Sequence, residues 1–179
     1  GDVGPMSRLA VSREQWVKSH FGVLGVPVEF QLDAGRLATK FKALQRKWHP
    51  DRTHGSEEAA RQSARINEAY QILREPHKRA AYMLDMLGAS LGEEVDDLAM
   101  ADPELLEYAM AARESIDEAE SDASLRNIAA DTELLVDQVE EPLQRAFQTD
   151  NLAEARRLTA RLQYYNRILA TIADKLPAD

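Results

Sequence analysis

The stretch QRKWHPDRTHG, residues 45–55, decides how the first half of this chain is organised. It closes an amphipathic run at Pro50, because the residue before a proline is biased away from helical dihedral angles. It also places His49, Asp51 and His54 within six positions of one another. Such crowding is compatible with a metal site, a catalytic site or a docking site. The flanking sequence is needed to distinguish these three kinds of site.

The flanks of this stretch predict two helices joined by a tight loop. The helix before it begins with Asp33 as N-cap and ends near Trp48, and the helix after it begins with Ser56 as N-cap. Each has an apolar stripe at helical spacing. The stripes are Leu37, Phe41, Leu44 and Trp48 in the first helix and Ile66, Ala69, Tyr70 and Leu73 in the second.

Metal and enzyme chemistry find little support around this loop. The chain has no cysteine, and no glutamate or third histidine stands near His49 and His54 at the spacing of a helical zinc motif. There is no glycine-rich phosphate loop and no nucleophile elbow. We therefore expect no metal, no cofactor and no enzymatic activity.

Charge divides the chain in two. Residues 1–88 carry 14 Lys and Arg against 10 Asp and Glu, whereas residues 89–179 carry 8 against 21. The acidic half would repel phosphate, and no apolar run approaches the ~20 residues of a membrane span. We therefore expect neither a nucleic-acid nor a membrane partner.

Breakers and composition predict the domain limits. We expect an expression scar with the start Met over residues 1–6, one domain over residues 12–88, an acidic linker over residues 89–102, and a second domain over residues 103–179. One short helix of the first domain should open with Ser12 as N-cap and be stopped by Gly22, Gly25 and Pro27. A fourth helix should begin at Pro76 and be capped by Gly88.

The second domain is predicted to be an antiparallel bundle of three helices. The first starts at Pro103, and the next runs from about Ser124 to Phe147 with a kink or break at Pro142. The last carries apolar residues at alternating spacings of three and four, from Ala155 to Leu176. The predicted fold class is all-α.

The His49-Pro50-Asp51 loop, the basic helix before it and the sequence KRAAY after it, residues 78–82, together resemble a J domain. J domains bind the ATPase domain of seventy-kilodalton heat-shock chaperones and stimulate ATP hydrolysis, so the resemblance implies that activity here. A loop that displays an imidazole and a carboxylate beside a positive helix also suits steering onto an acidic partner. The candidate docking residues are His49, Pro50, Asp51, Arg36, Lys40, Lys42, Arg46, Lys47 and Arg52. A solvated basic face opposite a buried stripe is the alternative reading.

Over nearly its whole length the chain is similar to the HscB-type J co-chaperones of iron–sulfur cluster assembly. The similar parts are FGVLGVPVEFQLD (residues 21–33), REPHKRAAYML (residues 74–84), ARLQYYNRI (residues 160–168) and the acidic bundle. The resemblance implies that the bundle holds an iron–sulfur scaffold protein (IscU-like) and delivers it to a specialised ATPase chaperone of the Hsc/DnaK class (HscA-like). The cysteine-pair module of some members is absent, which favours the bacterial, cytoplasmic type.

The family's scaffold contacts carry over to Leu106, Met110, Glu114 and Tyr164. Glu107 and Ala111 depart from the family pattern. Independently of the family, Leu106 and Met110 lie beside the apolar stripe that the bundle needs, which is typical of a partner site. Two alternatives stay open: a wider bundle core, and a J-protein whose bundle serves another client or dimerises.

Overall fold

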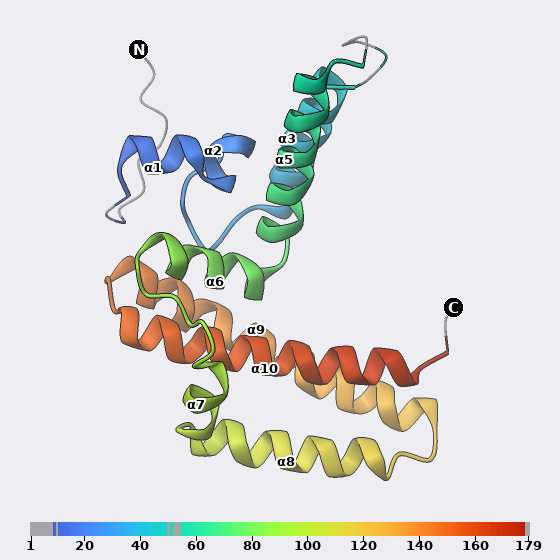
Figure 1. Cartoon of the computed structure of the whole chain (residues 1–179). Coiled ribbons are helices and arrows are strands. Elements are labelled where there is room, and N and C mark those ends of the chain that lie inside the picture. The colour runs from blue at the N-terminus through green and yellow to red at the C-terminus, as the bar shows by residue number, and fades with distance from the viewer. Residues whose placement is uncertain (1–8, 10, 50, 52–54, 178–179) are drawn as a thin grey trace. The chain divides into compact units, whose positions relative to one another are not determined.

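The computed structural model describes residue 9, residues 11–49, residue 51 and residues 55–177. Within them, regular secondary structure is helical throughout, so the prediction of an all-α fold is confirmed (Figure 1). The chain separates into two compact units, residues 1–88 and residues 89–179. No helix of the described residues combines the length and the apolar character that crossing a membrane requires.

The first unit contains five helices in its described residues. They are α1 (Arg13–Lys18), α2 (His20–Leu24), α3 (Ala34–Lys47), α5 (Glu57–Leu73) and α6 (Pro76–Met86). The long helices α3 and α5 lie side by side, and α5 also packs against α2 and α6 (Figure 1). The predicted helical hairpin on either side of the loop is therefore present.

The helix ends follow the predicted capping residues. The side chains of Asp33 and Ser56 accept hydrogen bonds from the first turns of α3 and α5, and Pro76 opens α6. Gly88, just beyond α6, has a φ of 71°, the left-handed region that favours glycine. Ser19 adds an unpredicted cap, which separates α1 from α2 where the sequence predicts one short helix.

In the first unit, side chains near α2 and α6 are more deeply buried than those toward the loop between α3 and α5. Leu37 is buried, whereas the later stripe residues Phe41, Leu44 and Trp48 are only half-buried. Figure 1 shows the reason, because the loop end of the α3–α5 pair extends beyond the other helices of the unit. There Phe41 stacks on Tyr70, with ring centroids 4.0 Å apart.

The second unit contains α7 (Val95–Met100), α8 (Pro103–Asp117), α9 (Asp122–Gln148) and α10 (Leu152–Lys175). Helices α8, α9 and α10 form the predicted antiparallel bundle, in which α9 and α10 pack along most of their length. Of the predicted kink or break at Pro142, the break does not occur, since α9 continues as one helix through Pro142. Pro142 and Gln138 are both exposed, so water can bind the Gln138 carbonyl that lacks an N–H partner at Pro142.

Helix α7 lies inside the segment that the sequence predicts to be an acidic linker. Val95 and Ala99 are four residues apart, are both buried, and belong to a helix that packs on α10. The segment after Gly88 is thus an ordered part of the second unit. The sequence did not predict this helix, because its two buried residues, Val95 and Ala99, stand among acidic residues.

Candidate functional site

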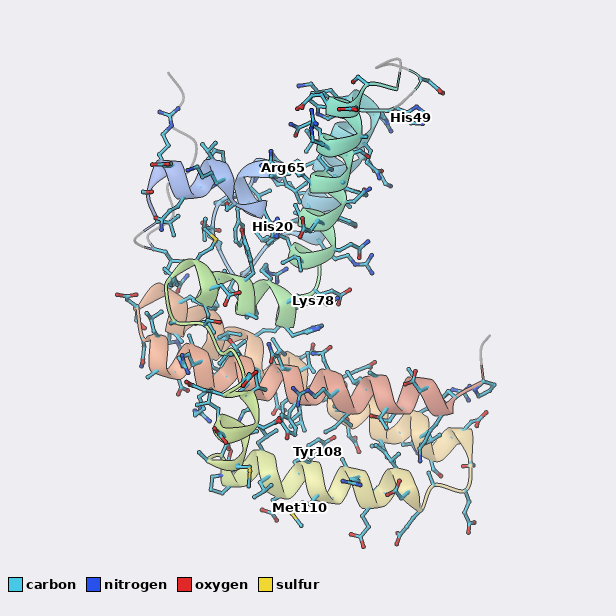
Figure 2. All side chains as sticks on the ribbon, in the orientation of Figure 1. His20, His49, Arg65, Lys78, Tyr108 and Met110 are labelled. Atoms are coloured by element: carbon cyan, nitrogen blue, oxygen red, sulfur yellow. The ribbon has the colours of Figure 1, made fainter. Side chains whose placement is uncertain are left out.

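The first candidate site is the loop between α3 and α5. His49 and Asp51 are both exposed, and the imidazole Nδ1 lies 3.5 Å from a carboxylate oxygen of Asp51. The backbone N–H of Asp51 also donates to Nδ1, at 3.3 Å. Figure 2 places His49 at the loop end of the hairpin, whereas Pro50 and Arg52 lie outside the described residues.

The predicted basic residues of α3 do not form a single face. With 100° of rotation per residue, Arg36, Lys40 and Lys47 share one side of the helix, whereas Lys42 and Arg46 share another. All of them except the half-buried Lys40 are exposed. The row of Lys42 and Arg46 lies farther from the apolar stripe than the other row.

Two members of the first row also contact their own unit. The Lys40 ammonium group donates to the backbone carbonyl of Gly25 at 2.8 Å, and the Lys47 ammonium group lies 5.5 Å from the centre of the Trp48 ring. Lys40 therefore ties α3 to the turn after α2. It has a structural role that the sequence pattern did not indicate.

Residues of the sequence KRAAY, 78–82, make contacts at the end of the hairpin that is opposite the loop. Arg79 is buried, donates to the Leu73 carbonyl at 2.6 Å, and lies over the ring of Phe30. The Tyr82 hydroxyl accepts a hydrogen bond from the backbone N–H of His20, and the two rings pack 4.4 Å apart. Burial lowers the pKa of His20 below its usual value. These residues hold α2, α5 and α6 together and thereby fix the base of the hairpin.

The second candidate site lies on α8. Leu106 is 40% exposed and Met110 67% exposed. Glu114, one further turn along the helix, is also exposed. In Figure 2, Tyr108 points from α8 into the bundle and Met110 points away from it. A wider bundle core therefore does not account for Leu106 and Met110.

Tyr164, the fourth predicted scaffold contact, is half-buried and faces α7. Its hydroxyl donates to the Asp96 carboxylate at 3.3 Å, and the Arg167 guanidinium lies 5.1 Å from the centre of its ring. Arg167 in turn binds Asp96 at 2.9 Å. Hydrogen bonding and the positive charge of Arg167 lower the pKa of Asp96. The four predicted scaffold contacts are thus divided: three lie on α8, and Tyr164 lies on the side of α10 that faces α7.

An ion-pair cluster joins the start of α8 to α10. The buried Asp102 caps α8 through the Leu105 N–H and accepts hydrogen bonds from Arg157 and Arg161. These bonds, with Arg161 the largest cause, lower the pKa of Asp102 to about 2. Sequence reasoning missed the cluster, although arginines on one helix and an acidic run before another were a signal for it.

No group of three or more His, Cys, Asp or Glu side chains that could hold a metal ion occurs in the part of the chain that the structure describes. His54, which completes the histidine pair of the loop, lies outside that part.

Comparison with protein families gives two matches. Residues 19–82 match the DnaJ domain, and residues 101–173 match the HSCB C-terminal oligomerisation domain. The first match covers the hairpin with its loop. The second covers the bundle from the end of α7 into α10.

Individual proteins with similar sequences carry related names. The iron–sulfur cluster co-chaperone protein HscB homolog of Arabidopsis thaliana is 32% identical over 162 residues, which are 88% of this chain and 63% of that protein. The chain thus spans less than two thirds of that relative. A co-chaperone protein HscB homolog of Acinetobacter baumannii is 29% identical over 86% of this chain and 88% of that protein.

The fold agrees with a solved structure of the same name. The crystal structure of human co-chaperone protein HscB matches with a TM-score of 0.79 at 26% identity, and covers 88% of this chain and 82% of that one. With a DnaJ domain followed by an HscB C-terminal domain, the chain belongs to the HscB-type J-proteins.

Proposed function

We propose that this chain is a non-enzymatic adaptor in iron–sulfur cluster assembly. Its first unit stimulates the ATPase of a seventy-kilodalton (HscA-like) chaperone, and its second unit binds an IscU-like scaffold protein and delivers it to that chaperone. The observation that carries the proposal is the presence in one chain of a DnaJ domain with an exposed His49–Asp51 pair and an HscB C-terminal domain with an exposed apolar row. We place this activity in a bacterial cytoplasm, in line with the Acinetobacter relative.

The geometry of the loop supports the chaperone half of the proposal. An exposed imidazole and carboxylate at the tip of a hairpin can reach into a partner's surface, while the cations of α3 attract an acidic partner over a longer range. Charged groups of this kind mainly set the rate of association, whereas the pair at the tip supplies the specific contact.

The chaperone half is tested with the steady-state ATPase rate of the chaperone. We expect His49→Gln to reduce the stimulation about tenfold or more, the loss that follows when a contact worth about 1.4 kcal/mol is removed. Arg65→Gln is the control, because Arg65 is exposed on α5 of the same unit but lies outside the loop (Figure 2). Undiminished stimulation by His49→Gln would refute this half.

The scaffold half is tested by capture of the scaffold protein. We expect the double substitution Leu106→Ala/Met110→Ala to raise the Kd about tenfold or more, since exposed apolar residues at the centre of a partner surface are its usual energetic contributors. Leu134→Ala is the matched control, an exposed leucine on α9 of the same unit. Equal capture by the double variant and wild type would exclude α8 as the binding surface.

A second candidate function is self-association, which the description of the matched domain as an oligomerisation domain favours. The exposed row on α8 would then contact a second copy of this chain. Sedimentation equilibrium of the purified chain discriminates the two, because a single species near 20.1 kDa at micromolar concentration leaves the row available to the scaffold.

A further inference from the structure

Exposed apolar side chains of the second unit gather on two consecutive helices. The exposed large hydrophobic residues among the described ones are Val17, Met100, Leu106, Met110 and Leu134, and three of these lie on α7 and α8. Met100, at 68% exposure, is the most exposed of them. Single exposed apolar residues need no explanation, but a group on adjacent elements marks an interaction surface.

The position of Met100 on α7 follows from the contacts of its neighbours. Val95 and Ala99 are the buried residues of this helix. Asp96 and Met100 are four residues apart and so share one side of the helix. Because Asp96 accepts the hydrogen bond of the Tyr164 hydroxyl, this is the side of α7 next to Tyr164. Met100 therefore lies one turn along from the point at which α7 and α10 are joined.

Polar contacts from α10 hold α7 in this position. Arg167 binds Asp96, and Arg156 binds Glu94 together with the backbone carbonyl of Ser90 at 2.7 Å. A six-residue helix without a side-chain N-cap would have little stability alone, so these contacts and its two buried residues keep it ordered. An exposed side chain on a helix held in this way is available for binding at a low entropic cost.

The charge around this surface indicates the kind of partner. The second unit carries 8 Lys and Arg against 21 Asp and Glu. Its exposed acids on α7 and α8 include Asp97, Glu107, Glu114 and Asp117, with Arg113 as the exposed cation of α8. Such a surface is complementary to a basic patch that carries an apolar side chain at its centre.

We propose that α7 is part of the scaffold-binding surface, that Met100 contacts the scaffold directly, and that Asp96 and Arg167 are positioning residues for it. The occupant is the iron–sulfur scaffold protein, which would present an apolar side chain flanked by Lys or Arg. This inference rests on the proposed function and extends its site from α8 to α7. Helix α7 lies in the segment that the sequence predicts to be a linker, and it precedes the matched domain, which begins at residue 101.

The proposal gives Tyr164 an indirect contribution. Its hydroxyl already binds Asp96, and its ring lies beneath Arg167. Removal of the hydroxyl would therefore act through the position of α7 and Met100. A direct contact made by the Tyr164 hydroxyl would instead be independent of Met100.

The experiment measures the Kd of the full chain for the scaffold protein by calorimetry at low and high salt. We expect Met100→Ala to raise the Kd about fivefold or more, as for an interface residue worth about 1 kcal/mol, and Leu134→Ala to change it less than about twofold. The matched exposure of Leu134, at 59%, makes it the control for loss of an exposed apolar side chain. Higher salt should weaken binding, because the proposed partner surface is basic.

A double-mutant cycle tests the positioning role. Asp96→Ala is expected to weaken binding in wild type and to have little further effect in the Met100→Ala background, whereas Asp96→Glu should restore most of the affinity. Additive effects of Asp96→Ala and Met100→Ala would overturn the positioning role.

The proposed scaffold site on α8 and its extension to α7 are refuted by different results. If Leu106→Ala/Met110→Ala weakens binding but Met100→Ala does not, the extension to α7 is wrong while the proposed function stands. If neither weakens binding, the scaffold site on this unit is wrong altogether.

Discussion

Asp102 shows how much one residue contributes to the second unit. It caps α8, accepts hydrogen bonds from two arginines of α10, and is 5% exposed. A buried carboxylate without such partners would be strongly destabilising, whereas one that is fully hydrogen-bonded fixes the relative position of two helices. The sequence marks Pro103 as the helix start, and the acidic run before it with the arginines of α10 indicates ion pairs, but spacing does not identify Asp102 as the acid that becomes buried.

The pH dependence of stability should report Asp102. Its pKa is lowered from 3.8 to about 2 in the folded chain. The stabilisation, on the order of 2 kcal/mol, is therefore present above about pH 4 and is lost as the pH falls through about 2. Urea unfolding should find Asp102→Asn less stable than wild type by roughly that amount at about pH 7, with the difference shrinking toward about pH 3.

The exposed Asp97 supplies the control for this measurement. Asp97→Asn should leave the free energy of unfolding within about 0.5 kcal/mol of wild type at either pH. A constant difference between Asp102→Asn and wild type across the whole pH range would show that the substitution acts through packing and not through the charge of Asp102.

At the scale of the element, α3 has two basic rows with different surroundings. Lys40 of the first row contacts the Gly25 carbonyl, and Lys47 lies over Trp48. Lys42 and Arg46, on the other row, are exposed. The sequence predicts all of these residues as one docking face. Helical spacing gives the side of the helix on which a side chain is attached, but not the group that its charged end contacts.

We expect the second row to contribute more to chaperone binding. Lys42→Ala/Arg46→Ala should raise the concentration of this chain that half-maximally stimulates the chaperone ATPase by about three- to tenfold, and higher salt should reduce the difference. Lys40→Ala should instead lower the melting temperature of the first unit, because it breaks a contact with α2's turn. If Lys40→Ala alone gave the kinetic loss, the assignment of the rows would be reversed.

Elements with their own caps and stripes were predictable, and elements that depend on distant partners were not. The ends of α3, α5 and α6 follow Asp33, Ser56 and Pro76, all of which act locally. Helix α7 was missed because its order depends on α10, and the continuity of α9 was missed because Pro142 lies on an exposed side. Local chemistry is visible in the sequence, whereas a contact more than 50 residues away is not.

The candidate site divides in the same way. Spacing alone predicted the outward position of Leu106 and Met110, which the structure confirms by their exposure. The engagement of Tyr164 with Asp96, 68 residues away, could not be derived from spacing. The roles of the docking and scaffold residues stay predictions until their variants are measured.

At the scale of the whole molecule, the chain consists of two compact units with opposite net charge. Among the described residues, the ion pairs of the second unit include Glu94–Arg156 near one end and Asp117–Lys175 near the other. Each unit is compact by itself.

This predicts that the second unit folds by itself only when α7 is included. A fragment of residues 89–179 should be helical and should bind the scaffold within about twofold of the full chain. A fragment of residues 101–179 loses the buried Leu91 and Val95 and should be less stable by about 3 kcal/mol or more. Circular dichroism with urea unfolding compares the two, and equal stability would show that α7 is not part of the folding unit.

The arginines of α10 that reach back to residues 89–104 also set an order of events during synthesis. Arg157 and Arg161 pair with Asp102 across 55 and 59 positions, and Arg167 pairs with Asp96 across 71. On the ribosome, the acidic segment therefore emerges before the arginines that pair with it, so these ion pairs can form only after α10 has been translated. The hairpin unit, complete at residue 88, can fold during that interval. A nascent chain would thus acquire its proposed chaperone-stimulating part first and its proposed cargo-binding part last.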